Sequence, residues 1–264
     1  MSTTSSAGRP KRRSWLDYAR AFGRAHRKAK AQLDSSMPLL EHLEELRQRL
    51  FKAFAALVVA TALSFVFAGQ LVDLMAAPIG GRKALVSIEV TENVAIFMRV
   101  SLLSGVVLAI PVIAYQILAF VFPGLTQREK RWLVLSVPFA SLLFISGVAF
   151  TWYVMLPAAI PFLINFLGIT TQVRPNNYFE FTTSIMFWIG LSFEMPLIVF
   201  FLAKLKLVKA SQLVQYWRHA VVVMAIVAAV VTPTIDPINM SLVMLPLGVL
   251  YAISIVLAVF AGRG

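Results

Sequence analysis

The chain has 264 residues, of which 59% are hydrophobic and 14% are charged, and its formal net charge is +12. Soluble domains are about 45–50% apolar and about 25% charged, so this composition indicates a polytopic membrane protein and excludes an ordinary soluble one. The absence of cysteine excludes disulfides, thiolate metal sites and a cysteine nucleophile.

Residues 1–36 form a polar, basic extension ahead of the first apolar stretch. The extension carries nine lysines and arginines against two aspartates. It lacks the apolar core of a signal peptide, so we expect it to be retained. Trp15, Tyr18 and Phe22 could share one helical face and lie on anionic lipid. A disordered, solvated tail accounts for the same composition.

Six apolar stretches follow within residues 37–264, which we expect to form one transmembrane domain. They lie at Leu50–Phe67, Val94–Phe122, Trp132–Ile160, Thr182–Leu205, Ala220–Val231 and Met240–Phe260. The fifth has 12 residues, which as a helix reach about 18 Å against a hydrocarbon core of about 30 Å. Five spans are therefore an alternative to six.

The charges of the loops predict the orientation. Of the 24 lysines and arginines, 20 fall on the side that holds the N-terminus. The other side carries only Arg82, Lys83, Arg99 and Arg174. The positive-inside rule then places both termini in the cytoplasm, and an even number of spans fits that placement.

Glu194 is the only charged side chain within the apolar stretch Phe181–Ala203. An ionised side chain at mid-bilayer costs about 2.5–3.5 kcal/mol on insertion scales, so such a residue is a candidate functional site. A protonated glutamic acid bonded to a neighbouring backbone carbonyl is the structural alternative. Prolines interrupt the same stretches and predict kinked helices around a groove, at Pro111, Pro138, Pro196 and Pro246.

Acidic residues also stand out on the basic, cytoplasmic side. The segment before the first span has leucines at the spacing of an amphipathic helix. In that helix we expect Arg49 to pair with Glu45 at i+4. We likewise expect Arg47 to pair with Glu44 at i+3, and Glu129 lies in the next loop on this side. Carboxylates pair well with guanidinium groups, so this surface suits a ligand that carries arginines. A solvated helix face and pairing with neighbouring cations are the plainer interpretations.

No pattern in the chain predicts an enzyme, a metal site or a cofactor. The three histidines lack metal-ligand spacing, and there is no glycine-rich phosphate loop. In the last outer loop, Asp236 is expected to cap the sixth helix.

Four segments that occur in order resemble the TatC family, the multi-spanning core of the twin-arginine protein translocase. They are His42–Leu50, Ala119–Arg131, Gly190–Leu197 and Thr232–Pro237. The resemblance implies an all-α integral membrane protein whose six kinked transmembrane helices form a concave, glove-like bundle with both termini inside.

The resemblance also implies a function. TatC-like proteins bind the twin-arginine signal peptides of folded proteins at the cytoplasmic face of the cell inner membrane. They assemble with the single-span subunits TatA and TatB and with other TatC copies, surrounded by membrane lipid, and are driven by the proton-motive force. Neither a cofactor nor a nucleic acid is implied.

The same resemblance implies roles for individual residues. Signal-peptide binding is implied for Glu45, Arg47, Phe120, Pro123, Leu125 and Glu129. Contact with a partner helix is implied for Glu194, Thr232 and Met240, the last at a position where many members carry Gln. Structural roles in the outer loops are implied for Pro78 and Asp236.

Two other functions are compatible with a buried carboxyl in a membrane. In a proton-coupled small-molecule transporter Glu194 would carry the proton, and in a non-transporting scaffold it would be structural. The sequence shows no internal repeat and no second ionisable group near mid-membrane, which disfavours the transporter.

Overall fold

The computed structural model describes residues 15–121, 127–165, 172–232 and 237–262. The side chains of residues 15–39, 121, 127–133, 238 and 239 lie outside that description. The described backbone is helical apart from short connections and an isolated parallel bridge between Leu85 and Val173. The chain divides into two compact units, Met1–Leu50 and Phe51–Gly264.

Helix α1 (Trp15–Ser64) makes up the described part of the first unit and continues into the second. The predicted amphipathic helix before the first span is therefore confirmed, and Pro38 does not end it. The leucine stripe is exposed within the described residues, with Leu43 60% and Leu50 65% accessible. The division of the chain at residue 36 stays a prediction.

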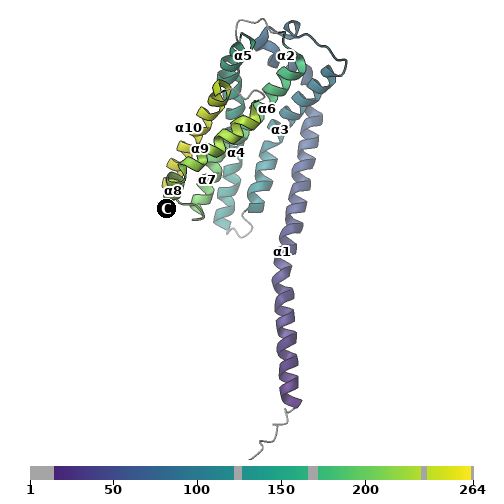
Figure 1. The fold of residues 1–264 in the computed structure, drawn as a ribbon. Coiled ribbons are helices and arrows are strands. Elements are labelled where there is room, and N and C mark those ends of the chain that lie inside the picture. Colours follow the sequence, from purple (N-terminus) through teal and green to yellow (C-terminus); the bar gives the residue numbers. More distant parts are fainter. Residues whose placement is uncertain (1–14, 122–126, 166–171, 233–236, 263–264) are drawn as a thin grey trace, which may run out of the picture. The chain divides into compact units, whose positions relative to one another are not determined.

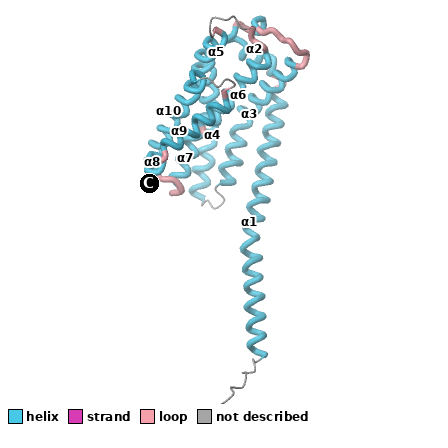
Figure 2. The backbone as a smooth tube through the Cα atoms, in the orientation of Figure 1, coloured by secondary structure: helices cyan, strands magenta, loops and turns pink. Residues whose placement is uncertain are grey.

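The second unit is a bundle of helices joined by loops (Figures 1 and 2). In chain order after α1 its elements are α2 (Ala68–Ala76), η1 (Ala77–Ile79), η2 (Arg82–Ala84), α3 (Glu92–Val121), α4 (Gln127–Phe150), the π-helical turn η3 (Thr151–Met155), α5 (Leu156–Ile164), α6 (Pro175–Phe193), α7 (Met195–Lys204), α8 (Ala210–Gln215), α9 (Trp217–Val231) and α10 (Pro237–Gly262). Figure 1 shows α2 and α5 at one end of this unit and α8 with the C-terminal end of α10 at the other. We call these the α2 end and the α8 end.

Several helices of the described chain are long and apolar enough to cross a membrane. Four qualify by themselves, at Glu92–Phe120, Val134–Ile164, Pro175–Lys204 and Met240–Gly262. The segments Leu40–Ser64 and Ala68–Ile79 qualify together, although the pair is bent by 77° at its break. Helix α9 has 15 residues and thus reaches only about 22 Å. The protein is therefore a multi-pass membrane protein, while the count of six spans and the orientation stay predictions.

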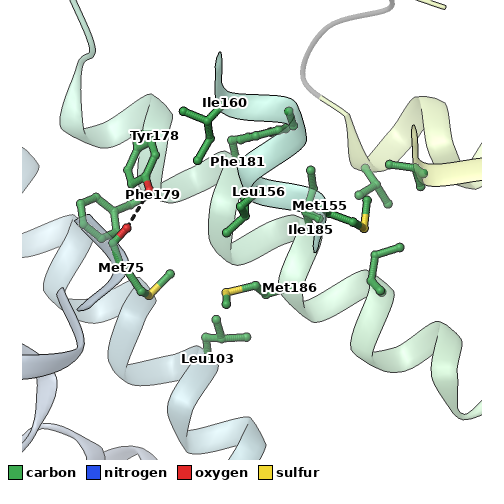
Figure 3. Close-up of a cluster of buried hydrophobic side chains, with 14 of the residues drawn as sticks. Met75, Leu103, Met155, Leu156, Ile160, Tyr178, Phe179, Phe181, Ile185 and Met186 are labelled. Carbon is green, nitrogen blue, oxygen red and sulfur yellow. Dashed lines mark hydrogen bonds between the residues drawn. The ribbon is translucent and has the colours of Figure 1, made fainter. Parts of the chain in front are cut away.

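A buried core joins α2, α3, α5 and α6 near the α2 end (Figure 3). Phe179 and Leu156 are fully buried there. The hydroxyl of Tyr178 donates a hydrogen bond of 2.6 Å to the backbone carbonyl of Met75, drawn as a dashed line in Figure 3. This bond ties α2 to α6. The position of α6 in turn sets that of Glu194, which directly follows it.

Helices α4 and α6 approach each other closely through two glycines. A Cβ added to Gly147 would lie 2.8 Å from the Cα of Gly190 and 2.9 Å from the ring of Phe193. A Cβ added to Gly190 would lie 3.0 Å from the ring of Phe144, which is 1% exposed. Small residues permit such close contact in membranes, where packing rather than the hydrophobic effect drives helix association.

The prolines act in two ways. Pro111, Pro138 and Pro246 lie inside helices that continue through them. Pro196 instead lies in the first turn of α7, directly after the interruption that follows α6. A proline is tolerated in a first turn because its missing N–H has no helical acceptor there. The interruption places Glu194 between two helices of one span.

Candidate functional site

Glu45 lies on α1 in the first unit with 34% of its side chain accessible. It already binds a guanidinium, because Arg49 donates to its Oε1 from Nη2 at 2.5 Å and from Nε at 2.9 Å. His42 Nδ1 lies 3.8 Å from the other carboxylate oxygen. The pairing of Glu45 with Arg49 expected from the i+4 spacing is confirmed.

Arg47 lies on the same helix and is exposed. Its Nη1 is 3.3 Å from Oε2 of Glu44, which confirms the expected i+3 pair. Both side chains are more than half accessible, and exposed pairs of this kind contribute little to stability. The pair is therefore easily exchanged for another partner.

The remaining residues proposed for peptide binding belong to the second unit. Phe120 lies in the last turn of α3 and is partly buried. Pro123 and Leu125 lie outside the described residues. Glu129 lies in the first turn of α4, but its side chain is outside the description. The grouping of these residues with Glu45 stays a prediction.

Glu194 occupies the interruption between α6 and α7. Its backbone N–H donates to the carbonyl of Leu191 at 3.1 Å, and its own carbonyl accepts from Ile198 at 3.0 Å. The two helices are thus connected without a loop. Glu194 is four residues after Gly190 and directly follows α6, so it continues the face of α6 that packs against α4.

The carboxyl of Glu194 is buried, with 9% of the residue accessible, and its Oε1 has no hydrogen-bond partner in the described structure. A buried polar atom without a partner costs free energy and calls for a physical explanation. The sequence left open a bond between this carboxyl and a neighbouring backbone carbonyl; Oε1 forms none among the described residues, and for Oε2 that alternative stays open. A polar group from outside the chain would supply the missing partner.

The other expected contact residues lie on either side of the connection between α9 and α10. Thr232 directly follows α9, is 4% exposed, and donates from its hydroxyl to the carbonyl of Ala228 at 2.8 Å. Its hydroxyl is thus already engaged. Met240 lies in α10 and is partly buried. Pro78 is exposed in η1, and Asp236 lies outside the described residues.

The sequence interpretation missed a set of ion pairs at the α2 end. Glu92 is 3% exposed and accepts from Ser87 Oγ at 2.9 Å, from the backbone N–H of Ile88 at 3.1 Å and from Arg174 Nη2 at 3.1 Å. The same Nη2 of Arg174 also lies 3.3 Å from Oε1 of Glu89. These contacts join the loop before α3 to the start of α6. The sequence did contain a sign of these ion pairs, because acidic residues stand on the side of the membrane that carries few lysines and arginines.

Two further pairs occupy the same end. Arg99 Nη1 lies 2.9 Å from Glu180 Oε2, which joins α3 to α6. Arg82 pairs with Asp73 and joins η2 to α2. Three of the four cations assigned to the outer side by sequence therefore have acidic partners.

Comparison with known proteins gives consistent matches. The family described as Sec-independent protein translocase protein (TatC) matches residues 41–246. The protein of that name from Deinococcus radiodurans is 36% identical over 233 residues, which cover 85% of this chain and 86% of that protein. The chloroplastic TATC protein of Arabidopsis thaliana is 38% identical over 228 residues, or 85% of this chain and 67% of that protein. A crystal structure of the twin arginine translocase receptor TatC matches with a TM-score of 0.74 and 31% identity, over 84% of this chain and 100% of that one.

Proposed function

The chain belongs to the TatC family of Sec-independent protein translocase proteins, and we propose that it is the receptor that binds twin-arginine signal peptides at the cytoplasmic face of the inner membrane. In this proposal the chain is a transport component and not an enzyme. It assembles with TatA, TatB and further TatC copies and is driven by the proton-motive force. Family membership favours this function over a small-molecule transporter or a scaffold.

One observation carries the proposal for peptide recognition. Glu45 is accessible and holds a guanidinium through two hydrogen bonds to a single oxygen. The second oxygen lies 3.8 Å from Nδ1 of His42. Because charge-assisted bonds from arginine to carboxylate are strong and directional, a signal-peptide arginine can replace or join Arg49 at this carboxylate. We assign Glu129, Arg47, Phe120, Pro123 and Leu125 to the same receptor surface.

The test is site-specific crosslinking from positions 45 and 129 to a radiolabelled twin-arginine precursor and to its twin-lysine version. We expect crosslinks that are lost with the twin-lysine precursor. The combined variant Glu45→Gln with Glu129→Gln should abolish export of twin-arginine substrates. Glu41→Gln is the matched control, because Glu41 is an exposed acid one turn away on the same helix. Normal export by the combined variant would refute the assignment.

We further propose that Glu194, with Thr232 and Met240, contacts the membrane helix of a TatA or TatB subunit. The support is the buried Oε1 of Glu194, which lacks a hydrogen-bond partner among the described residues. A polar side chain on the incoming helix would satisfy it, and such bonds contribute about 0.6–2 kcal/mol in membranes. Glu194→Ala should therefore weaken co-purification with the partner subunits.

The control for this test is Ser192→Ala, two residues away. The Ser192 hydroxyl donates to the carbonyl of Trp188 at 2.7 Å, so its loss removes a hydroxyl without removing an unpartnered group. Co-purification should persist in this variant. Equal recovery of TatA and TatB with Glu194→Ala would overturn the partner assignment while leaving the peptide receptor proposal standing.

A further inference from the structure

The α8 end carries four cations in one continuous stretch without any acid. Lys204 ends α7, and Lys206 and Lys209 lie between α7 and α8. Arg218 lies in the first turn of α9, and all four residues are exposed. Residues 204–218 contain no aspartate or glutamate. We call this stretch the basic platform.

Among the described residues, the cations of the basic platform lack the acidic partners that three cations of the α2 end have. Within the described residues none of the four forms an ion pair with an acid. At the α2 end, by contrast, Arg82, Arg99 and Arg174 are each paired. The Arg218 guanidinium lies 5.7 Å from the centre of the Trp217 ring, a contact that leaves its positive charge uncompensated. The platform is therefore a site of free positive charge.

The backbone of the basic platform is held in place. Lys206 adopts a left-handed conformation with φ 61°, and the N–H of Leu207 donates to the carbonyl of Leu202 at 2.9 Å, which closes the end of α7. The Tyr251 hydroxyl of α10 donates to the carbonyl of Leu213 at 2.6 Å and fixes α8. The cations thus project from an ordered surface.

Apolar side chains are interleaved with the cations. Leu207 is 66% accessible, Val214 55%, and Tyr216 and Trp217 53% each. Trp217 begins α9, whose 15 residues reach about 22 Å, so this residue must lie close to the boundary of the hydrocarbon. Aromatic side chains with a polar edge concentrate at the level of the lipid headgroups.

We propose that the basic platform binds the headgroups of anionic phospholipids in the leaflet that faces the α8 end. Lysine and arginine donors contact the lipid phosphates, while Leu207 and Trp217 contact the upper parts of the acyl chains. A lipid supplies both kinds of contact at once, whereas an acidic soluble segment would satisfy only the cations. With the orientation proposed above, the leaflet is the cytoplasmic one, where anionic lipids generate a negative surface potential.

The expected strength follows from the charges. A basic residue near an anionic membrane surface contributes about 1 kcal/mol, which corresponds to about a fivefold change in affinity. The preference of the platform for anionic over zwitterionic lipid should therefore be at least about fivefold at low salt. It should fall as salt is raised, because exposed charges are screened.

The experiment measures quenching of Trp217 fluorescence in proteoliposomes of the full chain. The other four tryptophans are replaced by phenylalanine (Trp15, Trp132, Trp152 and Trp188). Brominated phosphatidylglycerol and brominated phosphatidylcholine are compared as quenchers, so the signal reports lipid next to the platform and not next to the basic extension. Mass analysis of the phosphatidylglycerol retained by the otherwise unmodified chain provides a second measurement.

The decisive variant replaces all four cations, as Lys204→Gln, Lys206→Gln, Lys209→Gln and Arg218→Gln. We expect equal quenching by both lipids and less retained phosphatidylglycerol. The matched control replaces the three lysines by arginine and should keep the preference. Equal quenching in the parent chain, or a preference that survives the fourfold Gln change, overturns the proposal. So does loss of the preference on adding soluble glycerol phosphate, which would indicate a site for small anions. The readout needs neither cargo nor partner subunits, so its failure leaves the receptor proposal standing.

Discussion

Replacement of Gly147 by alanine should force α4 and α6 apart. The new Cβ would lie 2.8 Å from the Cα of Gly190, where ordinary contacts are 3.4–4 Å. The atom it meets belongs to the backbone of α6, so no side-chain rotation can relieve the clash. The helices must therefore separate by several tenths of an ångström, and the ring of Phe193 must shift as well.

The magnitude follows from the cost of overpacking. Inserting a methyl group into a well-packed interior costs about 1–3 kcal/mol. Alanine also gains about 0.5–1 kcal/mol over glycine in a helix interior. We therefore expect a net loss of about 0–2.5 kcal/mol in the free energy of unfolding. Glu194 lies four residues after Gly190, so partner co-purification should fall as well.

Gly248→Ala is the matched control for this prediction. Gly248 lies inside α10, and a Cβ there would meet nothing within 4 Å. This variant should be unchanged or more stable, because only the helix preference operates. The measurement is equilibrium unfolding of the purified protein in mixed micelles, followed by circular dichroism. A Gly147→Ala protein as stable as Gly248→Ala would refute the close contact of α4 with α6.

Three further outcomes are expected. Tyr178→Phe removes the 2.6 Å bond to the Met75 carbonyl and should cost about 1 kcal/mol in the same unfolding assay; an unchanged midpoint would contradict that contribution. Glu92→Ala removes the common acceptor of three donors, so hydrogen exchange in residues 85–91 should accelerate, and unaltered protection would count against this anchoring role. Arg49→Gln frees Glu45 from its helical partner and should tighten binding of a twin-arginine peptide by no more than a few-fold, as measured by titration; weaker binding would mean that Arg49 takes part in the receptor site.

Much of the local structure could be predicted from sequence. The apolar stretches locate the spans, since Val94–Phe122 corresponds to α3 (Glu92–Val121) and Met240–Phe260 lies within α10. The pair of Arg49 with Glu45 followed from the i+4 spacing, because residues one turn apart on a helix are neighbours whatever surrounds them. Such inferences hold because both partners belong to one element.

The sequence by itself determined that this is a helical membrane protein with a single carboxyl in the middle of one span. Only the tertiary structure decided that this carboxyl lies at a helix interruption beside α4, where its Oε1 has no hydrogen-bond partner among the described residues. Only the tertiary structure decided that Arg174 donates a hydrogen bond to Glu92, 82 residues away in the chain. The Tyr178 bond to Met75 joins residues 103 apart. Spacing rules describe neighbours within one helix, whereas these contacts depend on which faces of different helices meet. That choice is made by small residues such as Gly147 and Gly190, whose role becomes visible only when the helices are packed.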